Sequence, residues 1–138
     1  MNLSVVFLDS GPLSQIVRRR GQNTDADACF VWAQNLTSAG VRLCVAEVND
    51  YEVRRELIRA GRISSVQRLD TFLSLVEYVP LTTAAMREAA SLWAQVRNSG
   101  NTTAPPEALD GDAILCAQVQ TFAITHRHYP VSVPLQIW

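Results

Sequence analysis

Short apolar runs rich in β-branched residues alternate with longer segments of helical periodicity, and this alternation limits the fold more than any other feature. Four runs are predicted as strands, at residues 3–8, 41–45, 76–81 and 122–125. The predicted helices cover residues 13–17, 25–38, 50–60, 63–73, 82–99 and 110–120. Because parallel neighbours need a crossover connection, the pattern predicts an α/β fold with a mainly parallel sheet.

The size and composition are those of one globular unit, and the 138 residues are predicted to form a single domain, 1–138. The three cysteines, at 29, 44 and 116, have apolar neighbours and no CxxC spacing, which indicates reduced, buried thiols in a cytoplasmic protein. No apolar run approaches the roughly 18 residues of a membrane span, so no membrane partner is expected. The net charge of −1 does not single out a nucleic-acid binder, although all 12 basic residues are arginine.

Acidic residues stand where predicted strands end or helices begin. Asp9 directly follows the first strand, and sites in open α/β sheets lie at the carboxyl ends of strands. Asp110 and Asp112 open a helix after the Gly- and Pro-rich loop 100–106. Helix capping is the alternative interpretation in each case, since Asp is favoured there. One helix start does not need two caps, so one acid of this pair is a candidate for another task.

Glu52 lies on the helix 50–60, for which Asn49 or Asp50 is the expected N-cap. Glu56 shares its face and has arginines at helical spacing, which indicates a solvated or salt-bridged residue. For Glu52, one turn from the strand end, we favour a functional role. Three carboxylates at one sheet edge would repel without a cation, and Mg²⁺ or Mn²⁺ prefers such oxygen ligands. A bound metal lowers the pKa of its water and neutralises an attacked phosphate, which suits phosphodiester hydrolysis.

At these residues the chain resembles the PIN domain, in particular the bacterial VapC-like toxin ribonucleases. The matching segments are 5–13 (VVFLDSGPL), 48–53 (VNDYEV) and 112–118 (DAILCAQ). They are similar to the family's strand-end Asp, its helical Glu and its Asp-x-x-Ile/Leu-x-Ala helix. The resemblance implies a three-layer α/β/α sandwich, an Mg²⁺ or Mn²⁺ cofactor and an RNA substrate. It implies catalytic and metal-binding roles for Asp9, Glu52 and Asp112, with Glu47 as the alternative to Glu52.

One segment departs from the family pattern. After its last core strand the family usually has a Thr-x-Asn/Asp-type segment that supplies a fourth polar or acidic group, whereas residues 124–129 here contain no acid. His126 or His128 could replace that group as a metal or phosphate contact, or both are surface residues, which we favour. Asp110 then becomes a candidate fourth metal ligand. The candidate substrate-binding residues are Ser10, Thr125, His126 and Arg127.

The resemblance also implies two protein partners: a small antitoxin that inserts a segment into the acidic cleft, and a second copy of the chain. The mean hydropathy of +0.05 and the apolar residues of 63–75 suggest a self-associating face. The predicted function is a metal-dependent endoribonuclease that is the toxin of a toxin–antitoxin pair. The alternative is a catalytically degenerate PIN domain that binds RNA or protein.

Two other classes are disfavoured by particular residues. A phospho-accepting signalling domain with Asp9 as acceptor needs a lysine, and the chain has none. Haloacid-dehalogenase-type chemistry needs a second Asp two residues after the first, and position 11 is Gly.

Overall fold

A computed structural model describes residues 4–100, 105–125 and 131–132. The elements in chain order are β1 (Val5–Phe7), α1 (Ser10–Ile16), α2 (Thr24–Ser38), β2 (Arg42–Ala46), α3 (Glu47–Arg59), α4 (Ile63–Leu73), β3 (Glu77–Val79), α5 (Thr83–Asn98), α6 (Ala108–Thr125) and β4 (Val131–Ser132). In this part of the chain, no helix combines the length and the apolar character needed to cross a bilayer.

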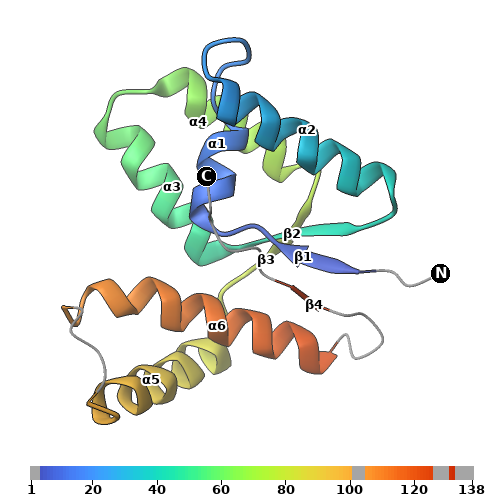
Figure 1. The fold of residues 1–138 in the computed structure, drawn as a ribbon. Coiled ribbons are helices and arrows are strands. Elements are labelled where there is room, and N and C mark those ends of the chain that lie inside the picture. Colours follow the sequence, from blue (N-terminus) through green and yellow to red (C-terminus); the bar gives the residue numbers. More distant parts are fainter. Residues whose placement is uncertain (1–3, 101–104, 126–130, 133–138) are drawn as a thin grey trace.

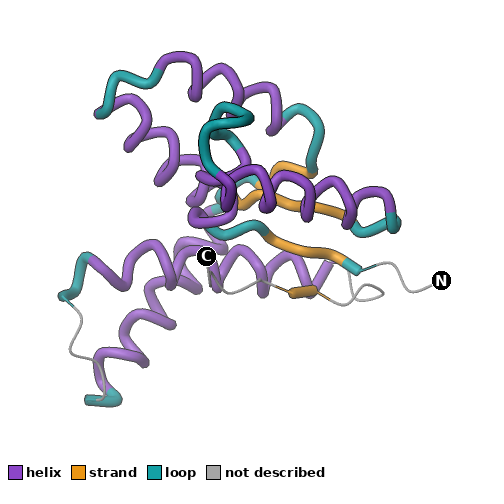
Figure 2. Tube along the Cα trace, turned by 45° about the horizontal axis from the view of Figure 1, so that its top comes forward, coloured by secondary structure: helices purple, strands orange, loops and turns teal. Residues whose placement is uncertain are grey.

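The strands form one parallel sheet in the order β3-β2-β1-β4. Helices α1 to α4 lie on one side of it, and α5 and α6 lie on the other (Figure 1). The strands therefore run between two helical layers (Figure 2). The predicted fold class, a three-layer α/β/α sandwich with a mainly parallel sheet, is confirmed.

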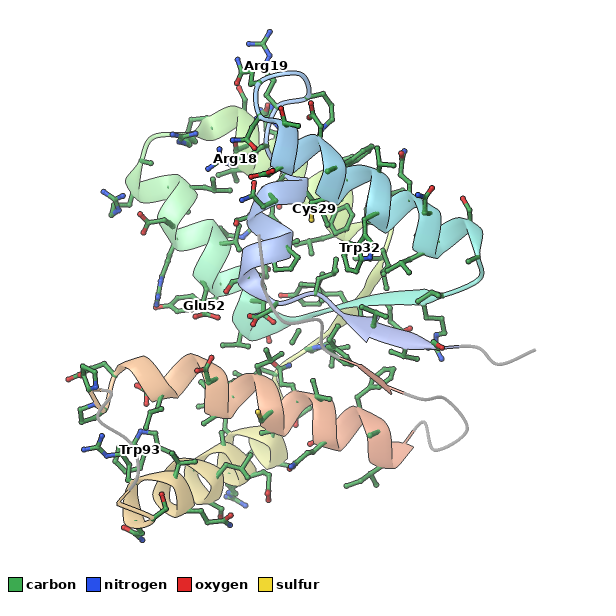
Figure 3. The ribbon with its side chains drawn as sticks, viewed as in Figure 1. Arg18, Arg19, Cys29, Trp32, Glu52 and Trp93 are labelled. Carbon is green, nitrogen blue, oxygen red and sulfur yellow. The ribbon has the colours of Figure 1, made fainter. Side chains whose placement is uncertain are left out.

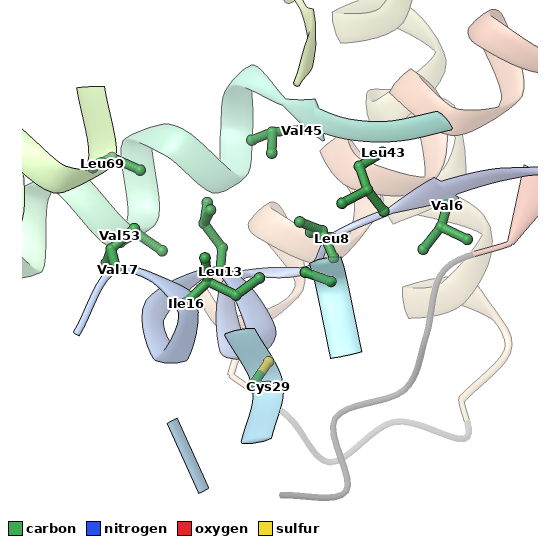
Figure 4. Packing of buried hydrophobic residues seen from close by; sticks show 11 residues of the cluster. Val6, Leu8, Leu13, Ile16, Val17, Cys29, Leu43, Val45, Val53 and Leu69 are labelled. Carbon is green, nitrogen blue, oxygen red and sulfur yellow. The ribbon is translucent and has the colours of Figure 1, made fainter. Parts of the chain in front are cut away.

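Alternate residues of the central strands supply two separate cores. Val6 of β1 and Leu8 just after it face α1, α2 and α4 (Figure 4), whereas Val5 and Phe7 of β1 face α6. Such alternation is the period of a strand with both faces covered. The ring of Phe7 meets that of Phe122 from α6 edge to face, with centroids 5.2 Å apart. Each buried side chain of this kind contributes about 1.5–3 kcal/mol to stability.

The strand predicted at 122–125 is wrong, because α6 continues through it to Thr125. Leu115 and Phe122 lie seven residues apart and pack in the same core, which is a helical spacing. A short apolar run does not distinguish a buried strand from a buried helical turn. The fourth strand instead comes later, at Val131–Ser132, and pairs with β1.

Helix α3 begins earlier than predicted, at Glu47, so neither Asn49 nor Asp50 is its N-cap. The cap residue is Ala46, which has no capping side chain. The side chain of Gln118 from α6 supplies the missing acceptor, since its Oε1 accepts a hydrogen bond from the Val48 N–H at 3.2 Å. A long-range contact thus replaces the local cap on which the prediction depended.

The thiols are buried at Cys29 and Cys44, as predicted, but Cys116 is exposed. The expectation of a buried thiol at 116 is therefore wrong. Its apolar neighbours in sequence, Leu115 and Ala117, are buried on other faces of α6 and leave position 116 on the solvent side.

Candidate active site

Asp9 stands at the carboxyl end of β1 and is also the N-cap of α1. Its Oδ1 accepts hydrogen bonds from the Ser10 N–H at 2.7 Å and from the Asn49 Nδ2 at 3.3 Å. Within the described residues, every hydrogen bond to this carboxylate goes to Oδ1. One oxygen therefore serves the helix cap, and Oδ2 is left for another partner, so the capping and functional interpretations are compatible.

Asn49 joins Asp9 to Glu52. Its Nδ2 also donates to Glu52 Oε1 at 3.2 Å, and its side chain is fully buried. The Asn49 Oδ1 is buried without a hydrogen-bond partner in the described part of the chain. Only a capping role was predicted for Asn49, so this bridge was not expected. The signal available was its spacing of three residues from Glu52, which puts both on one face of α3.

Glycine 111 allows α6 to approach Glu52 closely. A Cβ added at Gly111 would lie 2.6 Å from Glu52 Oε2, inside the contact distance of real side chains. Glu52 lies near the middle of α3, on the side toward α6 (Figure 3). Asp112 is the next residue along α6, so this contact also brings Asp112 near Glu52. The residue pattern around Gly111 did not predict this close approach.

The pKa of the Glu52 carboxyl is raised from its ordinary value. Burial is the largest cause, and the charges of Asp9 and Asp112 add to it, while Arg55 and the Asn49 hydrogen bond oppose it. The structure therefore brings Asp9, Glu52 and Asp112 within electrostatic reach of one another. Among the described residues, no three Asp, Glu, His or Cys side chains converge closely enough to enclose a metal ion as they stand.

The other candidate residues lie elsewhere or have other partners. Glu47 accepts a hydrogen bond from the Leu81 N–H at 2.7 Å, which directs it to the β3–α5 connection and away from Asp9. Asp110 lines a cleft of about 390 Å³ between α5 and α6, together with Met86 and Trp93. The side chain of Thr125 and the residues 126–128, with both histidines and Arg127, lie outside the described residues. Ser10 lies beside Asp9, to which its N–H and Oγ donate.

Comparison with known proteins finds the same fold at low sequence identity. No protein-family model and no curated protein matches the chain. A chain of the crystal structure of VapBC2 from Rickettsia felis, bound to a DNA fragment from their promoter, matches with a TM-score of 0.62 and 11% identity, covering 94% of this chain and 98% of that one. A chain of DNA-bound VapBC from Salmonella typhimurium matches with a TM-score of 0.57 and 13% identity, covering 95% and 98%. These likenesses show the fold of the chain.

Glu52→Gln should make the metal-free protein more stable at pH 7. A raised folded-state pKa means that the protonated carboxyl favours folding, and that stability is lost as the pH rises from the unfolded-state pKa through the folded-state pKa. Gln cannot ionise and can still accept from Asn49, so the gain should be present at pH 7, should shrink as the pH falls through the raised folded-state pKa of Glu52, and should be absent below the ordinary Glu value of about 4.3. Urea unfolding with a chelator, measured across this pH range, gives the difference.

Glu56→Gln is the matched control for this series. The Arg59 partner holds the pKa of Glu56 below its usual range, so this change should leave stability at pH 7 unchanged or slightly lower. If Glu52→Gln were less stable than the wild type at pH 7, Glu52 would not face the other carboxylates.

Gly111→Ala tests the contact between α6 and Glu52 without any activity measurement. Ala in place of Gly inside a helix stabilises by roughly 0.5–1 kcal/mol. In the wild type the new methyl group must displace the Glu52 carboxylate, so the gain in unfolding free energy should be smaller. In a Glu52→Ala background the full gain should return. Equal gains in both backgrounds would show that the Glu52 carboxylate does not lie against Gly111.

Proposed function

We propose that this chain is a ribonuclease of the PIN type that hydrolyses RNA phosphodiester bonds with Mg²⁺ or Mn²⁺. One observation carries the proposal: Glu52, from α3, has its pKa raised in part by Asp9 after β1 and by Asp112 on α6. The three carboxylates come from separate segments of the chain and lie within electrostatic reach of one another near the carboxyl edge of a parallel sheet, where α/β proteins place their sites.

The donor set suits a hard divalent cation. Carboxylate oxygens are the ligands that Mg²⁺ and Mn²⁺ prefer, and a cation would relieve both the burial of the Glu52 carboxylate and its repulsion by Asp9 and Asp112. In this proposal Asp9, Glu52 and Asp112 hold the ion, which requires their flexible side-chain ends to close on it. Asp110 lies at the α5–α6 cleft, and we propose that it contacts the ion through a water molecule and not directly.

The chain's own residues have distinct roles in the proposed reaction. A bound ion would supply a water of lowered pKa and neutralise charge on the phosphate. Asn49 holds one oxygen each of Asp9 and Glu52, so it fixes the direction of their remaining oxygens. Gly111 leaves the space in which Glu52 Oε2 lies. Ser10 fixes the rotamer of Asp9 through its N–H.

We further propose that the chain is the toxin of a toxin–antitoxin pair and that it forms a homodimer. The two solved structures described above, to which the fold is similar, are of VapBC assemblies, and the segments around Asp9, Glu52 and Asp112 resemble VapC-like toxins. The homodimer is proposed at α4 and its following turn, where Ile63 is 66% and Leu75 77% exposed. A contiguous patch of exposed apolar side chains is what a second chain would cover.

Cleavage of a fluorophore- and quencher-labelled single-stranded RNA library tests the activity. The wild type should cleave with Mn²⁺ and lose activity in excess chelator. Asp9→Asn should lower the cleavage rate by more than about 100-fold. Loss of a group that only supports a metal ligand can cost up to about that factor, and Asp9 is proposed as a ligand itself. Asn is also a good N-cap, so this change should leave the fold intact.

Asp25→Asn is the control, because Asp25 is an exposed carboxylate in the first turn of α2 and is not among the residues of the candidate site. It should cleave like the wild type. RNA binding without cleavage in any divalent metal would favour the degenerate binding module instead. Equal cleavage by Asp9→Asn and the wild type would remove Asp9 from the site.

A further inference from the structure

A groove rich in arginine runs from the candidate active site along α1, α3 and the start of α4. It has a volume of about 550 Å³, and Glu52 lies in its wall. Its charged lining residues are two glutamates, Glu52 and Glu56, and four arginines. The arginines are Arg18, Arg55, Arg59 and Arg62. The chain as a whole has a net charge of −1, so this excess of positive charge is local to the groove.

Two of the four arginines have other partners. Arg59 forms an ion pair with Glu56, and the guanidinium of Arg55 lies 5.1 Å from the centre of the Tyr51 ring. Within the part of the chain that the structure describes, neither Arg18 nor Arg62 has a carboxylate within ion-pairing distance. Both are exposed, so their charges are available to a ligand.

The local structure fixes where these two charges stand. Arg18 follows Val17, the C-cap of α1, whose carbonyl accepts a hydrogen bond from Arg68 of α4 at 2.8 Å. Arg62 is the N-cap residue of α4 and makes no side-chain cap, so no side chain neutralises the positive end of that helix. Arg68 thus ties together the two segments that carry Arg18 and Arg62. Figure 3 shows Arg18 beyond the end of α1 and Glu52 nearer the sheet.

We infer that this groove binds the phosphate backbone of a single-stranded RNA, with Arg18 and Arg62 as its phosphate contacts. This inference rests on the proposed function, since the groove leads the strand to the carboxylates around Glu52. Guanidinium groups suit phosphate because their donors match its oxygens in pairs. The contacts are to the backbone, so they hold and orient the strand without reading its sequence.

Salt-dependent binding of a labelled single-stranded RNA of mixed sequence tests the groove. Fluorescence anisotropy is measured in chelator, which prevents cleavage, over a range of KCl concentrations. Each lost phosphate contact should reduce the steepness of the plot of log binding constant against log salt concentration by about 0.7. At about 0.1 M salt this corresponds to about five-fold weaker binding. Arg18→Gln and Arg62→Gln should each show this loss, and the double variant should lose about 25-fold.

Arg87→Gln is the matched control, because Arg87 is an exposed arginine of α5 on the opposite side of the sheet. It should bind like the wild type. If the Arg18 and Arg62 variants matched this control, the inference would be overturned, even for a protein that cleaves RNA. If they lost affinity while the wild type failed to cleave, the groove would stand and the proposed function would fall. Tighter binding of a labelled poly-glutamate peptide than of RNA would also overturn the assignment.

Discussion

The parallel pairing of β1 with β2 determines where Asp9 and the helix that carries Glu52 lie. Phe7 is in register with Cys44, and the Leu8 N–H donates to the Cys44 carbonyl at 2.9 Å just beyond the end of β1. Both strands therefore end at the same edge, where Asp9 follows one and α3 follows the other. The register itself is held by the alternation of buried side chains, since a slip of one residue would exchange the two cores.

Helix α6 completes the site from the other layer, and two residues set its position. Gln118 is 1% exposed and binds two elements at once: its Oε1 accepts from Val48 at the start of α3, and its Nε2 donates to the Val79 carbonyl of β3 at 2.9 Å. Gly111, two turns earlier, lets the helix approach Glu52. The buried hydrogen bonds of Gln118 and the absence of a side chain at Gly111 thus determine how near Asp112 lies to the other acids.

The sequence was sufficient for the features that depend on local patterns. The strand and helix alternation predicted the fold class, and the strand-end position of Asp9 predicted the edge at which Glu52 and Asp112 also lie. The roles of these three residues as metal ligands stay predictions. The remaining features depend on contacts between distant segments. The bridge made by Asn49 and the uncapped start of α3 both rest on partners from other segments, and the helical state of 122–125 depends on Phe122 meeting Phe7.

The central claim is that Asp9, Glu52 and Asp112 enclose one divalent cation site. Its most direct test is a crystal of the protein grown with Mn²⁺, with diffraction recorded near the manganese absorption edge. The account predicts an anomalous peak within about 2.0–2.6 Å of carboxylate oxygens from all three residues. It also predicts that the peak is lost in Asp9→Asn. A peak bound only by Asp110, or carboxylates that stay apart with Mn²⁺ present at saturating concentration, would contradict it.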